Sequence, residues 1–175
     1  MVDPQQETPV VNGWRLYAHP MFLEQLSTLV STVESLAKTD PQNYKQKNAT
    51  KRLAAIRDLM MVRIPADPKI ADFRQGGTLG DKHTHWFRAK FFQQYRLFFR
   101  FNDQQKIIII FGWVNDEKSK RAYDSKTDAY KVFAKMLGDG NPPTDWDALL
   151  AKAKAKEVTF AETIATIAAS GTFQK

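Results

Sequence analysis

The sequence predicts one α+β domain in which two N-terminal helices pack against an antiparallel-dominated sheet of four strands, followed by C-terminal helices. Two patterns along the chain predict this fold class. From Pro20 to Pro65, apolar residues recur at three- and four-residue steps, which is typical of amphipathic helices. Over residues 84–114 the pattern changes to that of closely spaced β-strands. With 175 residues, of which 43% are hydrophobic, the chain can bury a sizeable core.

The N-terminal part predicts a leader, a short strand and a helical hairpin. Residues 1–11 are polar and predict a flexible leader, and Trp14 begins a short first strand. One helix opens at Pro20 and is broken by Pro41, and a second helix ends at Pro65. Two amphipathic helices so close together predict an antiparallel helical hairpin.

The middle of the chain predicts an antiparallel meander. Residues 84–92, 95–101 and 106–114 are strand-like and are separated by short polar segments that fit hairpin loops. The last of these strands is apolar on both faces. It is therefore expected at the centre of the sheet, with cover on each side.

After residue 116 the pattern returns to helix. Asp128 completes a possible capping box, and Thr144 is a possible N-cap for a further helix. We expect residues 12–156 to form the domain and residues 157–175 to form a C-terminal extension. A capping box and apolar residues at helical spacing predict that this extension is a short helix, docked on the core through Phe160, Ile164 and Ile167.

Composition excludes several classes of site. The chain has no cysteine, which rules out disulfides, a thiolate nucleophile and cysteine-based metal sites. No apolar run approaches the ~20 residues of a membrane span, and the N-terminus is unlike a signal peptide, so we expect a soluble, cytoplasmic protein without a membrane partner. The net charge of +7 favours an anionic partner.

The meander contains the main candidate site. Alternation along the strands at residues 84–92 and 95–101 places one apolar face against the helices and gathers cations with aromatics on the other. The members of this second face are Trp86, Arg88, Lys90, Arg96, Phe98 and Arg100. Cations that meet phosphates and rings that stack on bases suit single-stranded RNA. The alternative is the ordinary polar outer face of an antiparallel sheet.

Two further clusters are weaker candidates. Asn115 and Asp116 follow the central strand and lead to Arg121 and Tyr123, and loops after strands often hold functional side chains. The alternative is that Asn115 and Asp116 form a turn or a cap. The histidines at positions 83 and 85 fall on one strand face, but no third ligand has a suitable spacing, and we expect no metal site.

The order of elements and several motifs resemble a known family. Two N-terminal helices, a meander carrying Tyr-Arg-Leu-Phe-Phe-Arg at residues 95–100, and Arg121 with Tyr123 resemble the RelE/ParE toxin superfamily. The resemblance is closest to the YhaV toxins of the PrlF–YhaV type II toxin–antitoxin system. It spans residues 11–150, and its stretches are residues 11–20, 40–44, 95–100, 112–117, 126–130 and 141–146.

The resemblance implies a RelE-like fold and a toxin that inhibits translation and growth. It implies an endoribonuclease that cuts mRNA, often on the ribosome, by attack of the 2′-hydroxyl on the adjacent phosphate, without a metal or other cofactor. It also implies a cognate antitoxin of the AbrB-like, PrlF type.

Matching the family's motifs residue by residue gives candidate roles. Arg96 stabilises charge in the transition state, and Arg121 stabilises charge or donates a proton. Tyr123 stacks on a base or assists proton transfer. Lys90 is a base only if neighbouring cations favour its neutral form. His83 is the remaining candidate for the acid.

The other candidates on the sheet face and after the central strand are assigned to RNA binding. They are Trp86, Arg88, Phe98, Arg100, Asn115 and Asp116.

Two other functions stay open at this point. A ParE-like or other RelE-fold toxin would inhibit a target by binding it, without cutting RNA. A basic RNA-binding module would spread its affinity over many phosphates and so tolerate loss of one cation. Degradation of RNA by the purified protein would favour the ribonuclease, because neither alternative cuts RNA.

Overall fold

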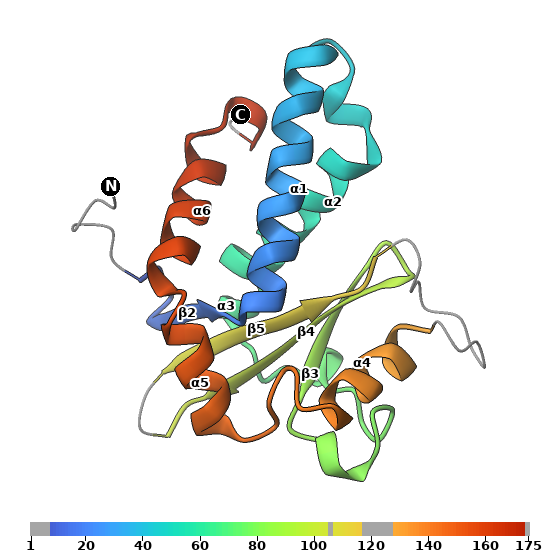
Figure 1. Ribbon diagram of the computed structural model, residues 1–175, viewed down its shortest axis with the longest axis vertical. Helices are drawn as coiled ribbons and strands as arrows, with labels where there is room; N and C mark the ends of the chain where they lie inside the picture. Colours follow the sequence, from blue (N-terminus) through green and yellow to red (C-terminus); the bar gives the residue numbers. More distant parts are fainter. Residues whose placement is uncertain (1–7, 105–106, 117–127, 174–175) are drawn as a thin grey trace.

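A computed structural model describes residues 8–104, 107–116 and 128–173 (Figure 1). The strands are β1 (Val10–Val11), β2 (Trp14–Ala18), β3 (Phe87–Phe91), β4 (Tyr95–Asn102) and β5 (Ile108–Val114). The helices are α1 (Pro20–Thr39), α2 (Asn48–Asp58), α3 (Ile64–Ala66), α4 (Ala129–Gly138), α5 (Trp146–Lys154) and α6 (Glu157–Ala169). A π-helical turn over Leu59–Arg63 joins α2 to α3.

The sheet has five strands in the order β1-β2-β5-β4-β3 and is mixed. Strands β3, β4 and β5 form the predicted antiparallel meander. Strand β2, however, runs parallel to β5, with Leu16 opposite Ile109. The prediction of an antiparallel-dominated sheet of four strands is therefore wrong in strand number, and the sheet is mixed because of this one parallel pair.

The additional strand comes from a tight hairpin at the N-terminus. Val11 pairs with Trp14, and the two residues between them, Asn12 and Gly13, have φ values of 50° and 84°. Asn-Gly is the preferred pair for a two-residue hairpin turn with positive φ at both positions. The Asn-Gly pair follows directly after the predicted leader of residues 1–11, and its turn makes residues 10–11 an edge strand instead of leader.

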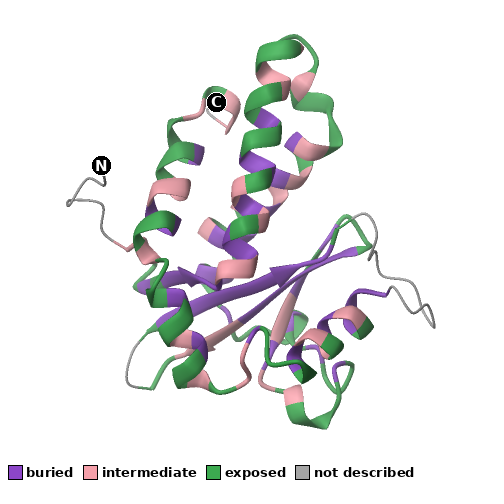
Figure 2. Cartoon of the chain, in the orientation of Figure 1, coloured by how far each residue is buried: buried purple, intermediate pink, exposed green. Residues whose placement is uncertain are grey.

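Strand β5 lies at the centre of the sheet, as predicted, and all seven of its residues are buried (Figure 2). Over residues 108–111 its side chains alternate between two hydrophobic cores, and an irregularity at Gly112 then shifts the register. Ile109 and Phe111 face the core formed with α1, α2 and α6. Ile108 and Ile110 face a second core formed with α4 and α5. Helices thus cover both faces of the sheet.

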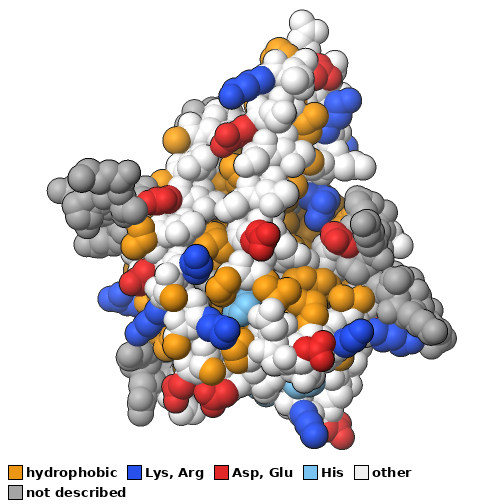
Figure 3. Space-filling view, viewed as in Figure 1, with side chains coloured by type: hydrophobic (Ala, Val, Ile, Leu, Met, Phe, Trp, Pro, Cys, Tyr) orange, Lys and Arg blue, Asp and Glu red, His pale blue; other side chains and the backbone are white. Residues whose placement is uncertain are grey.

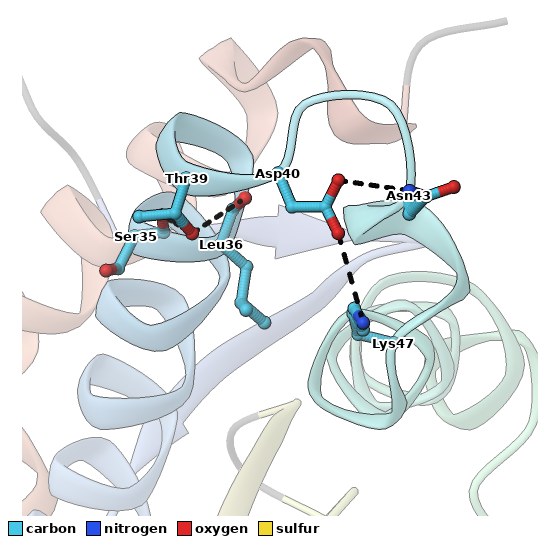
Figure 4. A network of polar contacts seen from close by, with 6 residues as sticks. All are labelled: Ser35, Leu36, Thr39, Asp40, Asn43 and Lys47. Carbon is cyan, nitrogen blue, oxygen red and sulfur yellow. Dashed lines mark hydrogen bonds and ion pairs between the residues drawn. The ribbon is translucent and has the colours of Figure 1, made fainter.

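The helical hairpin is confirmed by α1 and α2, and a polar network marks its connection (Figure 4). The backbone N–H of Asp40 donates to the carbonyl of Leu36 at 2.8 Å, which ends α1. The Asp40 carboxylate accepts from Asn43 Nδ2 at 3.1 Å and lies 3.9 Å from Lys47 Nζ, just before α2. Residues 40–44 therefore have a structural role in this turn.

The C-terminal extension forms the expected helix and belongs to the main core. Helix α6 packs beside α1 and against β2 (Figure 1). Phe160 and Ile167 are buried, Ile164 packs against the same cluster, and the Phe160 ring lies 6.4 Å from that of Phe111 on β5. The helix begins at Glu157, two residues before the capping box.

Gly112 in β5 is required by the close approach of Trp86. A Cβ atom at this position would lie 2.6 Å from Trp86 Cζ3, and the indole is buried and cannot move aside. We expect Gly112→Ala to destabilise the fold by about 1–3 kcal/mol through overpacking. Thermal unfolding measures the loss, and Gly138→Ala, where a Cβ meets no atom within 4 Å, is the matched control. Equal melting temperatures for the two variants would contradict the prediction.

The buried His19 at the start of α1 makes the stability of the fold depend on pH. Its Nδ1 accepts from the Met21 N–H at 3.2 Å and caps the helix, so this buried histidine is structural. Burial, together with the nearby charge of Lys152, lowers the pKa of His19 to about 4. Between pH 6.5 and pH 4 the unfolded chain binds a proton that the folded chain does not, so stability falls as pH falls through this window.

We expect the titration of His19 to make the free energy of unfolding about 2 kcal/mol lower at pH 5 than at pH 8. Asparagine is a good N-cap without a titrating group, so His19→Asn should flatten this part of the pH profile while keeping the helix. Urea unfolding from pH 8 to pH 4 measures the difference. The same pH slope in both proteins would assign the destabilisation to other groups.

Candidate active site

The strand register brings three of the predicted cations together at one end of the sheet. Lys90 on β3 lies directly opposite Arg96 at the start of β4, and Arg88 lies two residues before Lys90 on the same strand face. Lys90 is exposed, Arg88 is partly buried, and Arg96 is only 7% exposed. The predicted alternation of faces along β3 and β4 is confirmed, because Leu97 and Phe99 lie in the opposite core.

Two of these cations converge on the phenol of Tyr130. Arg88 Nε donates to its hydroxyl oxygen at 2.8 Å, and Arg96 Nε donates to the same oxygen at 3.2 Å. Tyr130 is buried in the first turn of α4, where the side chain of Asp128 caps the helix by accepting from the Tyr130 N–H. The phenol therefore fixes the two guanidinium groups relative to each other.

Asn115 fixes the backbone around Arg96. Its Oδ1 accepts from the Arg96 N–H at 2.6 Å, and its Nδ2 donates to the carbonyl of Gln94 at 2.9 Å. The side chain is fully buried. Asn115 thus positions Arg96 and the turn before it, and the prediction that it contacts RNA directly is not compatible with this burial.

The guanidinium of Arg96 is largely engaged within the protein. Nη1 donates to the carbonyls of Gln93 and Tyr95, at 2.7 and 3.0 Å, and Nε is held by Tyr130. Among the described residues, no hydrogen bond reaches Nη2. Arg96 can therefore offer a ligand one oriented nitrogen, with the rest of the group locked in place.

The predicted open face is wrong. Trp86 and Phe98 are fully buried beneath α4, where the Phe133 ring lies 5.1 Å from Trp86 and 4.3 Å from Phe98. They belong to the second core and cannot stack on bases in this structure. The amphipathic pattern of α4 was visible in the sequence, but the pattern does not say which face of the sheet a helix covers.

Arg100 lies apart from the other cations, four residues further along β4. Its guanidinium lies 5.8 Å from the ring of Trp86 and 5.2 Å from that of Trp146, and it donates to the carbonyl of Thr144. Burial lowers the pKa of Arg100 to about 10, and the nearby Asp145 partly offsets this effect. Arg100 thus joins β4 to the start of α5.

His83 and His85 precede β3, and His85 lies near Arg100. Burial, Arg100 and His83 lower the pKa of His85 to about 4, and the two imidazole rings are 6.4 Å apart. Strand register places them at the opposite end of β4 from Arg96, so His83 is not positioned to serve as the acid there. In the described ranges, no three His, Cys, Asp or Glu side chains form a group that could hold a metal ion.

The end of β5 completes the described part of the site. Asp116 is exposed and lines a groove of about 470 Å³ between α1, α2 and β5. Apolar side chains of Leu29, Ile56 and Trp113 also line it, together with Arg52. Figure 3 shows hydrophobic side chains gathered at the foot of α1, over β5. Arg121 and Tyr123 lie outside the described residues.

Tyr130 and Arg52 were not among the predicted site residues. Tyr130 lies on the buried face of α4, and a buried tyrosine hydroxyl usually requires a polar partner, which was the available signal. Arg52 lies on α2. Its guanidinium lies 5.1 Å from the Tyr95 ring, and its Nε is buried without a hydrogen-bond partner among the described residues.

No helix in the described ranges is long and apolar enough to cross a membrane.

Comparison with known proteins identifies the family. A family model described as a toxin with endonuclease activity, of a toxin–antitoxin system, matches residues 16–154. The ribonuclease toxin YhaV of Escherichia coli strain K12 is 50% identical over 141 residues, covering 79% of this chain and 91% of the relative. The toxin YhaV of Escherichia coli O6:H1 shows the same identity and coverage. No solved structure matches significantly. The chain therefore belongs to the YhaV toxin family, the endonuclease toxins of a toxin–antitoxin system.

Proposed function

We propose that this endonuclease toxin cuts mRNA, on the ribosome or free, and so inhibits translation and growth. The observation that carries the proposal is the convergence of Arg88 and Arg96 on Tyr130, with Lys90 opposite Arg96, in a chain 50% identical to a ribonuclease toxin. Three cations at one strand end suit a phosphate that gains negative charge. A RelE-like fold is compatible with the helical hairpin and the meander.

In the proposed reaction, the 2′-hydroxyl oxygen forms a bond to the adjacent phosphorus and the bond from phosphorus to the 5′-oxygen breaks. The 2′-hydroxyl proton passes to a base, and the leaving 5′-oxygen receives a proton from an acid. Arg96, through Nη2, and Lys90 stabilise the charge on the phosphorane. Tyr130 and Asn115 are positioning residues, because they hold Arg96 in place.

The roles of Arg121 and Tyr123 stay proposals from the family resemblance. Arg121 would stabilise charge or donate the proton, and Tyr123 would stack on a base or assist proton transfer. Lys90 is exposed beside Arg96 and acts in this proposal as a cation. It could serve as the base only in its neutral form, and Arg88 and Arg96 would then carry the charge stabilisation alone.

Cleavage is tested with purified protein, total RNA and intact ribosomes in the presence of a chelator. We expect fragments with 2′,3′-cyclic phosphate and 5′-hydroxyl ends, because the attacking oxygen belongs to the RNA itself. Fragments with 5′-phosphate ends would indicate attack by water and contradict the mechanism. Arrested translation with intact RNA would contradict the whole proposal.

One observation favours a toxin that acts by binding without cutting. Most of the Arg96 guanidinium is used inside the protein, which is what a purely structural arginine would show. The same cleavage assay decides between the two functions, because the binding toxin leaves RNA intact.

We further propose that the cognate antitoxin is AbrB-like, of the PrlF type, and covers the groove beside the site. The net charge of +7 favours an acidic partner, and the buried Arg52 Nε has no hydrogen-bond partner among the described residues. An apolar antitoxin segment carrying a carboxylate would fill the groove and pair with Arg52.

Hydrogen exchange of the toxin with and without antitoxin tests this surface. We expect slower exchange at residues 49–56, 86–100 and 113–116 in the complex. Exchange at α6 should change little, because that helix lies away from the groove. Unchanged exchange in all three segments would place the antitoxin elsewhere.

A further inference from the structure

The tip of the β3–β4 hairpin carries an exposed aromatic ring in an unfavourable backbone conformation. Phe92 has a φ of 46° and is 53% exposed, and the following Gln93 has a φ of 63°. Residues with positive φ in such loops are usually Gly, Asn or Asp, and a bulky side chain there is an outlier. Among the large hydrophobic residues exposed in the described ranges, Phe92 is the only aromatic one.

The site itself holds this tip in place. Arg96 Nη1 donates to the Gln93 carbonyl, and Asn115 Nδ2 donates to the Gln94 carbonyl. Site residues therefore fix the two turn residues that follow Phe92. The N–H of Gln94 donates to the carbonyl of Phe92 at 2.6 Å. Phe92 is therefore pre-positioned relative to Arg96 and does not sit on an independent loop.

The Phe92 ring packs on a series of aromatic side chains. Phe92 lies edge-on to Phe91, with ring centroids 5.6 Å apart, and Phe91 stacks on Tyr95 at 5.2 Å and 18°. The guanidinium of Arg52 lies over Tyr95. Phe92 is the exposed end of this series, at the end of the sheet where Lys90 pairs with Arg96. Phe91 and Tyr95 belong to the core on the other face of the sheet, so the ring and the two cations flank the same sheet end from opposite faces. An exposed ring at a sheet end that also carries cations suits stacking on single-stranded nucleic acid.

We propose that Phe92 stacks on an unpaired RNA base adjacent to the phosphate that Lys90 and Arg96 contact. This subsite rests on the proposed function, because it takes the same RNA strand as the active site. It replaces the stacking roles that Trp86 and Phe98, buried in the second core, cannot perform. Backbone strain at an exposed ring is explained when the ring has a binding role, since strained residues persist where function requires them.

The proposal predicts opposite changes in stability and function for one substitution. Phe92→Asn relieves the backbone strain and should raise the melting temperature by about 2–4 °C. The same substitution should weaken RNA binding and cleavage at limiting RNA by about tenfold to a hundredfold, since it removes one stacked base. Phe92→Tyr, which keeps a ring, should recover most of the lost affinity. Ile107→Asn removes an exposed apolar side chain at the other end of the sheet and is the matched control.

Binding is measured with short RNA that is fully 2′-O-methylated, which lacks the attacking hydroxyl and cannot be cut. A 2-aminopurine placed at successive positions should lose fluorescence at one position with the parent protein and keep it with Phe92→Asn. Equal affinity and equal fluorescence changes for the two proteins would overturn the proposal. Loss of antitoxin affinity alone, with RNA binding intact, would also overturn it and assign the tip to protein docking.

The readouts separate this proposal from the proposed function. If the parent protein binds the probe and changes its fluorescence through Phe92 but cuts no RNA, the stacking subsite stands and the ribonuclease mechanism fails. If the parent protein cuts RNA and Phe92→Asn cuts equally well at limiting RNA, the subsite fails and the function stands.

Discussion

Replacing Arg96 by alanine is expected to lower single-turnover RNA cleavage by about 10²–10³-fold and to abolish growth inhibition. Removal of one preorganised charge-stabilising group typically has an effect of this size. Arg96 meets the requirement for preorganisation, since Tyr130, Gln93, Tyr95 and Asn115 hold its side chain and backbone. The rate is measured at saturating enzyme, on ribosomes if free RNA is not cut, so that weaker binding alone does not lower it.

Further variants separate chemistry from folding. Arg96→Lys should recover only a small part of the rate, because an ammonium group cannot bond Tyr130 and two carbonyls while also reaching the phosphate. Arg15→Ala, an exposed arginine on β2, is the matched control and should cut normally. Melting curves check that Arg96→Ala is folded. A folded Arg96→Ala that cuts at the parent rate would make Arg96 a structural or docking residue.

Truncation after Glu157 is expected to remove most of the stability of the fold. It deletes all but the first residue of α6, including the buried Phe160 and Ile167. Burial of each such side chain contributes about 1.5–3 kcal/mol, and whole domains are stable by only about 5–15 kcal/mol. The truncated chain should also expose the apolar side of α1 and aggregate. Thermal unfolding and size-exclusion chromatography measure both effects.

A point mutation tests the contribution of α6 to stability even if the truncated chain is insoluble. Phe160→Ala should destabilise the full chain by about 3–5 kcal/mol through the cavity it leaves. Val158→Ala, at a partly exposed position on the same helix, should change stability by less than about 1 kcal/mol. An unchanged melting temperature for Phe160→Ala would make α6 a dispensable tail.

Local periodicity predicted most of the secondary structure and the faces of the strands. Arg96, Phe98 and Arg100 share one side of β4, as alternation requires, and β5 is central because both of its faces are apolar. Alternation says which residues share a face but not what covers that face. Helix α4 covers it, and so Trp86 and Phe98 became core residues where an RNA surface was expected.

The parts that sequence could not predict depend on contacts between distant segments. The pairing of β2 with β5 involves no hairpin and leaves no local pattern. The contact of Tyr130 with Arg88 and Arg96 joins α4 to the meander, and only the packed structure shows it. The Asn12-Gly13 turn is a local signal that the predicted elements did not use, and the exposed Phe92 was included as the last residue of the predicted strand 84–92.

The parallel pairing of β2 with β5 has a consequence for synthesis of this toxin. Because Leu16 pairs with Ile109, the N-terminal strand has no partner until nearly two thirds of the chain has been translated. The core is closed later still, when Phe160 of α6 reaches Phe111. Pairing across such a sequence distance makes folding late and slow. A nascent chain halted before α6 therefore lacks the closed core, and we expect toxicity to arise only after the whole chain has been released.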